Sequence, residues 1–243
     1  MTAERNGEAP SCKKIEELGT GCGFGSTHSV TPDRLWIKWN ICSNLGGVRQ
    51  MSFYSAEATQ PCVADLAGLL CGQGQMASFA KTAARLSVVV DDPWRARALA
   101  AALADRGIDP EVATTDLGHP LVRTAFRHDL TALASAWTKG AVKAVPPVST
   151  LHGAALRMWV LAAGHRLDRG YYLGLDARAP DTHETLADAV CRIGLPVSLV
   201  GVRGGSPGLR LIGSRRLARL EELIGDPPTG AAEQHWPSRT FVM

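Results

Sequence analysis

Between residues 62 and 225, the apolar positions form two series with the same order of spacings. Stretches with apolar side chains every three or four residues are separated by pairs of shorter stretches that alternate every second residue. These spacings match the α-helix and the β-strand, so the pattern predicts helices joined through β-hairpins. The first series predicts a helix at 64–70, strands at 76–80 and 85–90, a helix at 93–106, strands at 111–115 and 121–127, and a helix at 129–139.

The second series repeats this αββαββα order in a shorter form. It predicts a helix at 156–163, a strand at 169–176, a helix from 181 or 182 to 193, strands at 197–202 and 209–212, and a helix at 214–224. The segment 165–168 is too short for a full first strand, which is the weak point of the match. We therefore predict the α+β class, with tandem αββαββα repeats at 62–143 and 151–225, a pseudo-twofold relation between them and two antiparallel sheets.

The segments outside the repeats have a different composition. Residues 144–150 contain Pro146-Pro147, which continues neither a helix nor a central strand, so they are predicted to be a linker. Residues 1–55 are rich in Gly, Ser, Asn and Cys, and we expect a disordered or non-native extension there, with Met51 as an alternative start. The Pro- and Gly-rich residues 226–243 are expected to be a disordered tail.

Composition excludes several classes of function. The chain has 243 residues, is 45% hydrophobic and carries a formal net charge of +3, which is ordinary for a water-soluble protein. No apolar run reaches the roughly 18 residues of a membrane span, and no signal-peptide core is present, so a cytoplasmic protein without membrane partners is expected. The six cysteines form no CxxC pair, which argues against a zinc site. We expect no metal and no cofactor.

The first predicted helix carries a recognisable motif. Residues 66–74 read LAGLLCGQG, which resembles the LAGLIDADG motif of homing endonucleases, a family built on αββαββ repeats. The closer resemblance is to the degenerate N-terminal domain of WhiA-type sporulation regulators, because WVLAAG at 159–164 and the linker VKAVPP at 142–147 are also similar. The resemblance implies that the two motif helices pack together at the centre and that the sheets form a saddle over DNA. Together with the Ala-, Arg- and Gly-rich composition, it suggests an actinobacterial source.

Two departures from these families affect the expected activity. WhiA-type regulators carry a C-terminal helix-turn-helix domain, whereas no such pattern follows Gly225 here. The homing endonucleases hold divalent metals through the last acidic residue of each motif, and the matching positions are Gln73 and Ala163. Magnesium requires anionic oxygen ligands, which neither residue supplies. Asp65 lies two turns too early, and Asp168 could supply at most one carboxylate. We therefore expect a protein that is not an enzyme.

Basic residues on the predicted strands are the candidates for nucleic-acid binding. Between residues 62 and 225 there are 19 Lys and Arg against 15 Asp and Glu, a modest excess. Strand alternation predicts that Arg123, Ala125 and Arg127 share one face, suited to DNA phosphates. The alternative is that these arginines only solvate an exposed sheet face. Helix arginines such as Arg95 are expected to be plain surface residues. The six candidates are Arg85, Arg123, Arg127, Arg169, Arg203 and Arg210.

Three functions remain open at this stage. The first is a non-catalytic nucleic-acid-binding or regulatory protein, acting in transcription, sporulation or cell division, with double-stranded DNA as the partner. The second is a protein-interaction module that binds another regulatory protein and no DNA. The third, an active homing endonuclease, conflicts with Gln73 and Ala163 at the two ligand positions.

Overall fold

The computed structural model describes residues 55–147, 151–201, 206–231 and 235–237, all within the second of the two units into which the chain divides, residues 51–243. The extension predicted at residues 1–55, including Met51, lies outside the described residues except for Ser55. Ser55 is 2% exposed and caps a 3-10 turn, η1 (Ala56–Ala58). No helix in the described part of the chain is long and apolar enough to cross a membrane.

The first repeat follows the predicted order with one addition. A 3-10 turn, η2 (Val63–Leu66), leads into the first motif helix. The helix predicted at 129–139 ends at Trp137, and the chain turns back in a short hairpin, β5 (Thr138–Lys139) and β6 (Val142–Lys143). The other elements are α1 (Ala67–Cys71), β1 (Gln75–Phe79), β2 (Ala83–Val89), α2 (Pro93–Ala104), β3 (Pro110–Thr114), β4 (Pro120–Thr124) and α3 (Thr131–Trp137).

The second repeat contains a complete first hairpin, which the sequence left in doubt. Strand β7 begins directly after the second motif helix, with no intervening loop, and a tight turn at Asp168-Arg169 joins it to β8. The four residues that looked too few are therefore enough for a short strand. The elements are α4 (Gly153–Ala163), β7 (Gly164–Leu167), β8 (Gly170–Gly174), η3 (Pro180–Thr182), α5 (His183–Arg192), β9 (Ser198–Val200), β10 (Gly208–Leu211) and α6 (Ser214–Ile224).

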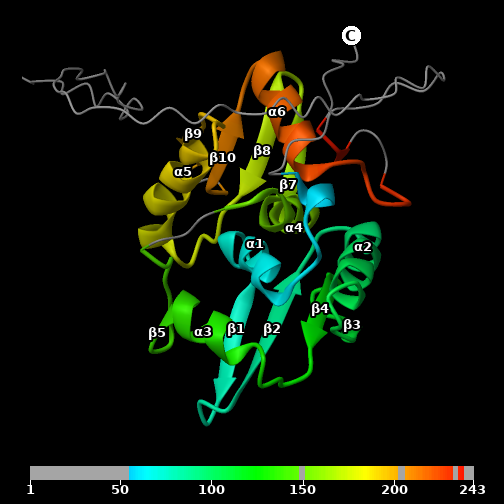
Figure 1. Ribbon diagram of the computed structural model, residues 1–243, viewed down its shortest axis with the longest axis vertical. Helices are drawn as coiled ribbons and strands as arrows, with labels where there is room; N and C mark the ends of the chain where they lie inside the picture. Colours follow the sequence, from blue (N-terminus) through cyan, green and yellow to red (C-terminus); the bar gives the residue numbers. More distant parts are fainter. Residues whose placement is uncertain (1–54, 148–150, 202–205, 232–234, 238–243) are drawn as a thin grey trace, which may run out of the picture. The chain divides into compact units, whose positions relative to one another are not determined.

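Each repeat builds one four-stranded antiparallel sheet, and the strand order is the same in both. The order is β1-β2-β4-β3 in the first sheet and β7-β8-β10-β9 in the second. In each repeat the two hairpins therefore pair through their inner strands, β2 with β4 in the first sheet and β8 with β10 in the second. The predicted α+β class and the two antiparallel sheets are confirmed. Figure 1 shows the two sheets in opposite halves of the molecule, with α1 and α4 between them.

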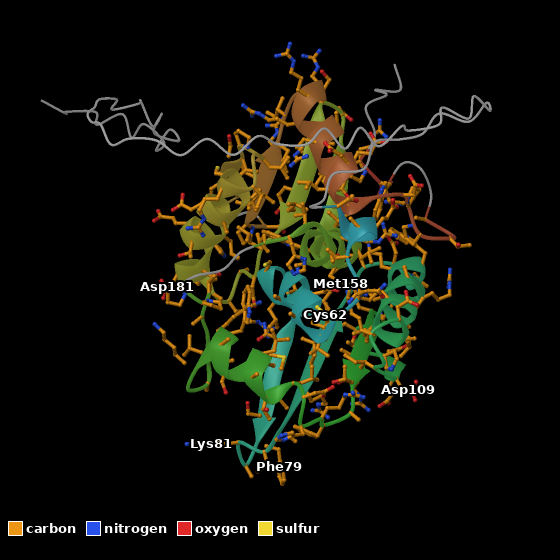
Figure 2. The ribbon with its side chains drawn as sticks, in the orientation of Figure 1. Cys62, Phe79, Lys81, Asp109, Met158 and Asp181 are labelled. Atoms are coloured by element: carbon orange, nitrogen blue, oxygen red, sulfur yellow. The ribbon has the colours of Figure 1, made fainter. Side chains whose placement is uncertain are left out.

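The β1–β2 hairpin turns through an unusual backbone conformation. Its two central residues, Ala80 and Lys81, have φ values of +48° and +58°, and the Thr82 N–H donates to the Phe79 carbonyl. Residues other than glycine, asparagine and aspartate rarely adopt this left-handed backbone conformation. Phe79 and Lys81 extend from the end of this hairpin (Figure 2).

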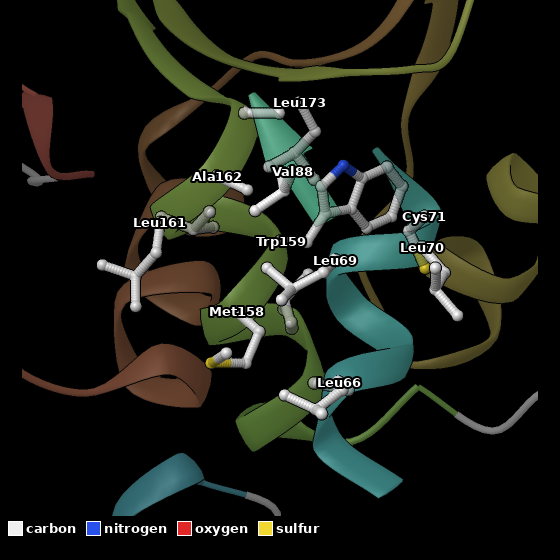
Figure 3. Close-up of a cluster of buried hydrophobic side chains, with 14 of the residues drawn as sticks. Leu66, Leu69, Leu70, Cys71, Val88, Met158, Trp159, Leu161, Ala162 and Leu173 are labelled. Atoms are coloured by element: carbon white, nitrogen blue, oxygen red, sulfur yellow. The ribbon is translucent and has the colours of Figure 1, made fainter. Parts of the chain in front are cut away.

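The core is centred on the contact between the two motif helices. A Cβ atom at Gly68 of α1 would collide with the main-chain carbonyl of Ala155 in α4, so only glycine permits the helices to approach so closely. Trp159 is fully buried at this contact, and its indole N–H donates to the Gly174 carbonyl at 2.8 Å. Leu69 lies beside Trp159, and Leu66 and Met158 lie farther along the two helices in the same cluster (Figure 3). The central pairing of the motif helices, implied by the family resemblance, is present.

Residues 226–243 were predicted to be disordered, but Trp236, one of the described residues of this segment, packs onto the core. Trp236 is 3% exposed, and its indole N–H donates to the Gly225 carbonyl at 3.0 Å. The Arg157 guanidinium lies 5.2 Å from the centre of the Trp236 ring. The Pro- and Gly-rich composition indicated disorder, but the apolar area of the Trp236 ring is large enough for its burial to be favourable.

Candidate functional site

The motif helices end close to each other, at the two positions where the sequence suggested lost acids. Gln73 follows the end of α1, and Ala163 is the last residue of α4. A Cβ atom at Gly72 would lie 3.3 Å from the Cβ of Ala163 and 3.4 Å from the Trp159 ring. Neither residue offers an anionic oxygen as a metal ligand. The chemistry of the helix ends therefore depends on the other side chains around them.

Lys143 occupies the end of α1. Its ammonium group donates to the carbonyl oxygens of Gly72 at 2.5 Å and Gly74 at 2.9 Å, and it forms a 3.1 Å ion pair with Asp176. The Lys143 side chain is only 8% exposed. Burial lowers the pKa of Lys143, while the charge of Asp176 acts in the opposite direction. A cation at this position suits the negative end of the helix dipole.

Asp176, just beyond β8, completes this cluster. One carboxylate oxygen accepts from Lys143 and from the Gln75 side-chain amide at 2.5 Å, and the other accepts from the Arg178 N–H at 3.0 Å. Burial alone would raise the pKa of Asp176. The Lys143 charge and these hydrogen bonds outweigh burial and hold the pKa below its ordinary value.

Arg95 caps the end of α4 in the same way, although the sequence suggested a plain surface residue. Its guanidinium is fully buried and donates to the carbonyls of Val160 at 3.1 Å, Leu161 at 2.8 Å and Gly164. It also lies 4.7 Å from the centre of the Trp94 ring. Burial lowers the pKa of Arg95. The position was detectable, because Arg95 shares the apolar stripe of α2 with Leu99 and Leu103.

These surroundings do not fit the divalent metals of a homing endonuclease. The nearest carboxylate, Asp176, is already engaged by Lys143 and Gln75. Asp65 pairs with Arg106 at 2.7 Å, and Asp168 lies in the exposed β7–β8 turn, at the opposite end of β7 from Ala163. Within the described ranges, no group of three or more His, Cys, Asp or Glu side chains could hold a metal ion. Each helix end is instead occupied by a cation of the chain itself.

Arg85 and Arg123 lie on the same exposed face of the first sheet. Ser87 pairs with Arg123 across the β2–β4 ladder, and Arg85 precedes Ser87 by two residues. Arg123 forms a double hydrogen bond with Glu111 of β3, at 2.7 and 2.8 Å. This bond lowers the pKa of Glu111 and neutralises much of the Arg123 charge. Arg85 forms no ion pair within the described part of the chain.

Arg127 does not share that face, because a β-bulge interrupts the alternation. Leu121 and Arg123 pair with β2 in one register, but the next bridge joins Ala84 to Arg127, one residue out of step. The Thr124 hydroxyl accepts the Leu86 N–H at 3.1 Å, where a strand carbonyl would otherwise bond. Such bulges re-aim the residues that follow them. The Arg127 side chain instead pairs with Asp129 at 2.7 Å.

The second sheet carries a row of polar side chains that crosses its four strands. Its exposed face runs through His165, Tyr172, Arg210 and Ser198, which are partners across three adjacent ladders. Burial lowers the pKa of His165, so Arg210 supplies the charge of this row. Arg169 lies exposed in the β7–β8 turn, and Arg203 lies outside the described residues.

The fold that holds these residues is LAGLIDADG-like, as the motif implied. The homing endonuclease I-WcaI, solved bound to its DNA recognition sequence, is similar with a TM-score of 0.51 and 12% identity, over 74% of this chain and 89% of that one. The N-terminal LAGLIDADG domain of DUF199/WhiA gives 0.48 and 11%, over 74% and 88%. Full-length DUF199/WhiA from Thermatoga maritima gives 0.48 and 13%, over 78% and 60%. No protein-family model and no curated protein matches the sequence.

Proposed function

We propose that this protein is a non-catalytic, DNA-binding regulator that holds double-stranded DNA against the exposed faces of its two sheets. The observation that carries the proposal is the exchange at the helix ends. Lys143 and Arg95 fill the positions next to Gln73 and Ala163, on a fold whose solved example I-WcaI is bound to DNA. In this arrangement the charged residues at the centre stabilise the fold, and the sheet surfaces are available for binding.

The non-catalytic part of the proposal follows from charge. A divalent metal at the end of α1 would face the Lys143 ammonium group across a few ångströms, and two cations repel each other strongly in a buried site. The single carboxylate there, Asp176, would have to exchange its present partners for the metal. Plasmid DNA incubated with magnesium and the purified protein should therefore stay supercoiled. Specific nicking by the wild-type chain that is lost in Asp176→Ala would overturn this part.

The binding part rests on the arginines that keep a free charge. Arg85, Arg169 and Arg210 lie on or beside the exposed sheet faces without an ion pair among the described residues, whereas Arg123 and Arg127 are paired with acids. Three phosphate contacts would give a slope of about −2.7 in a plot of log affinity against log salt. Affinity for a duplex should thus fall roughly 40-fold between about 50 and 200 mM salt.

Fluorescence anisotropy with a labelled duplex tests this prediction. The single variants Arg85→Ala and Arg210→Ala should each reduce the magnitude of the salt slope by about one. Arg97→Ala, an exposed arginine on helix α2, is the matched control and should leave the slope unchanged. The absence of binding at the lowest salt would overturn DNA binding, and an equal effect of all three variants would place the interface elsewhere.

A protein-interaction module is the second candidate. Neutralisation of Arg123 by Glu111 and of Arg127 by Asp129 favours it, because a DNA-binding face gains little from internally paired charges. The anisotropy experiment separates the two candidates, since a module for another regulatory protein has no reason to bind duplex DNA at low salt.

A further inference from the structure

Two phenylalanine rings lie exposed beside each other at one corner of the first sheet. Phe79 ends β1 with 63% of its surface exposed, and Phe126, just after β4, is 44% exposed. Their ring centres are 5.9 Å apart, with the planes inclined by 57°. Single exposed apolar side chains are ordinary, but neighbouring ones form a contiguous apolar patch of the kind found at binding sites.

Cationic side chains accompany these rings. The Arg85 guanidinium lies 4.8 Å from the centre of the Phe126 ring, and Lys81 extends from the hairpin turn next to Phe79 (Figure 2). The Arg127–Asp129 pair nearby is neutral as a unit, so the local excess charge is positive. We call Phe79, Lys81, Arg85 and Phe126 the hairpin corner.

Two departures from regular backbone geometry produce the hairpin corner. The left-handed φ values of Ala80 and Lys81 carry a conformational cost that glycine would avoid. The β-bulge after Thr124 moves Phe126 onto the exposed face of the sheet. Regular alternation would have placed Phe126 on the buried face. Both irregularities act on the same corner, and both bring an aromatic or cationic side chain outward.

We propose that the hairpin corner binds an unpaired nucleobase of DNA. The inference rests on the proposed DNA binding and names one subsite of it. Aromatic rings and a guanidinium plane stack on the faces of bases, and Lys81 and Arg85 attract the flanking phosphates. Because a paired base within a duplex hides both faces, the corner engages DNA at a bulged, nicked or extruded base.

The test compares two duplexes of one sequence, fully paired or carrying a single unpaired adenosine. The wild-type chain should bind the second about tenfold more tightly, the effect of one stacked base. Phe79→Leu/Phe126→Leu keeps the corner apolar but removes both π faces, so the preference should fall to less than about twofold while affinity for the paired duplex is retained. Phe126→Tyr keeps a π face and should preserve the preference.

The control is Leu117→Ala, because Leu117 is an even more exposed apolar residue (85%) in the β3–β4 turn, at the opposite end of the sheet. It should leave both affinities unchanged. If paired duplex binds with the expected salt slope but the unpaired base brings no gain, the subsite is wrong and DNA binding stands. If neither duplex binds at low salt, DNA binding itself fails and the subsite with it.

Discussion

At the residue scale, the most informative group is Asp176, a buried carboxylate whose partners are a lysine, an amide and the main chain. It accepts hydrogen bonds from Lys143, Gln75 and the main chain, and its side chain is 7% exposed. A buried ion pair of this kind adds little when compared with a well-packed apolar pair. Removal of only one partner is costly, because the other charge is left buried and alone.

Replacement of Asp176 by asparagine should destabilise the protein in a pH-dependent way. The folded state lowers the pKa of Asp176, so its contribution is complete above the ordinary aspartate pKa and is lost as the pH falls through the folded-state value. Asp176→Asn should lower the free energy of unfolding by about 3 kcal/mol at pH 7. The difference from the wild type should shrink below about pH 4.

Urea unfolding at a series of pH values measures this difference. Asp181→Asn, at an exposed residue of the turn η3, is the control and should run parallel to the wild type. A loss of stability by Asp176→Asn that is the same at all pH values would show that shape, and not charge, makes the residue important.

At the scale of the element, one extra residue in the β4 strand determines what the first sheet presents to solvent. The bulge after Thr124 withdraws Arg127 from the exposed face and brings Phe126 onto it. Two hydrogen bonds between the main chains of Ala84 and Arg127, at 2.8 and 2.9 Å, hold the shifted register. The Thr124 hydroxyl satisfies the Leu86 N–H that the shift leaves without a carbonyl.

Loss of this hydroxyl should weaken the bulge. Thr124→Val keeps the shape of the side chain but leaves a buried N–H without a partner, which costs about 1–2 kcal/mol in the free energy of unfolding. Hydrogen exchange at the Leu86 amide should accelerate correspondingly. Thr114→Val, on the exposed side of β3, is the matched control and should change neither quantity. Unchanged protection at Leu86 would mean that the hydroxyl does not hold the register.

At the scale of the whole molecule, the sequence predicted the order of the elements well and their long-range contacts poorly. The duplicated periodicity and the LAGLLCGQG motif are local signals, and Gly68 is needed at its position by helix packing. The contacts of Lys143 with Asp176, and of Arg95 with Val160, join residues 33 and 65 positions apart. No periodicity encodes such pairs, because they exist only after the two repeats have packed together.

The C-terminal segment gives a second whole-molecule expectation. Trp236 fills a site between Arg157 and Gly225, so Trp236→Ala should remove about 3 kcal/mol of stability and lower the melting temperature. Thr229→Ala, exposed in the same segment, is the control. Calorimetry should show the difference. Equal melting temperatures for the wild type and Trp236→Ala would instead restore the sequence-based prediction of a disordered tail.

The capping of the helix ends has a consequence for the independence of the two repeats. Arg95 of the first repeat closes the motif helix of the second, while Asp176 of the second repeat, with Lys143, closes that of the first. A homodimer of first repeats would lack the aspartate, and a homodimer of second repeats would lack the arginine. Each motif helix is thus capped with the help of a charged side chain from the other repeat. Separate expression of either repeat would therefore leave its motif helix without a buried charge that the intact chain supplies.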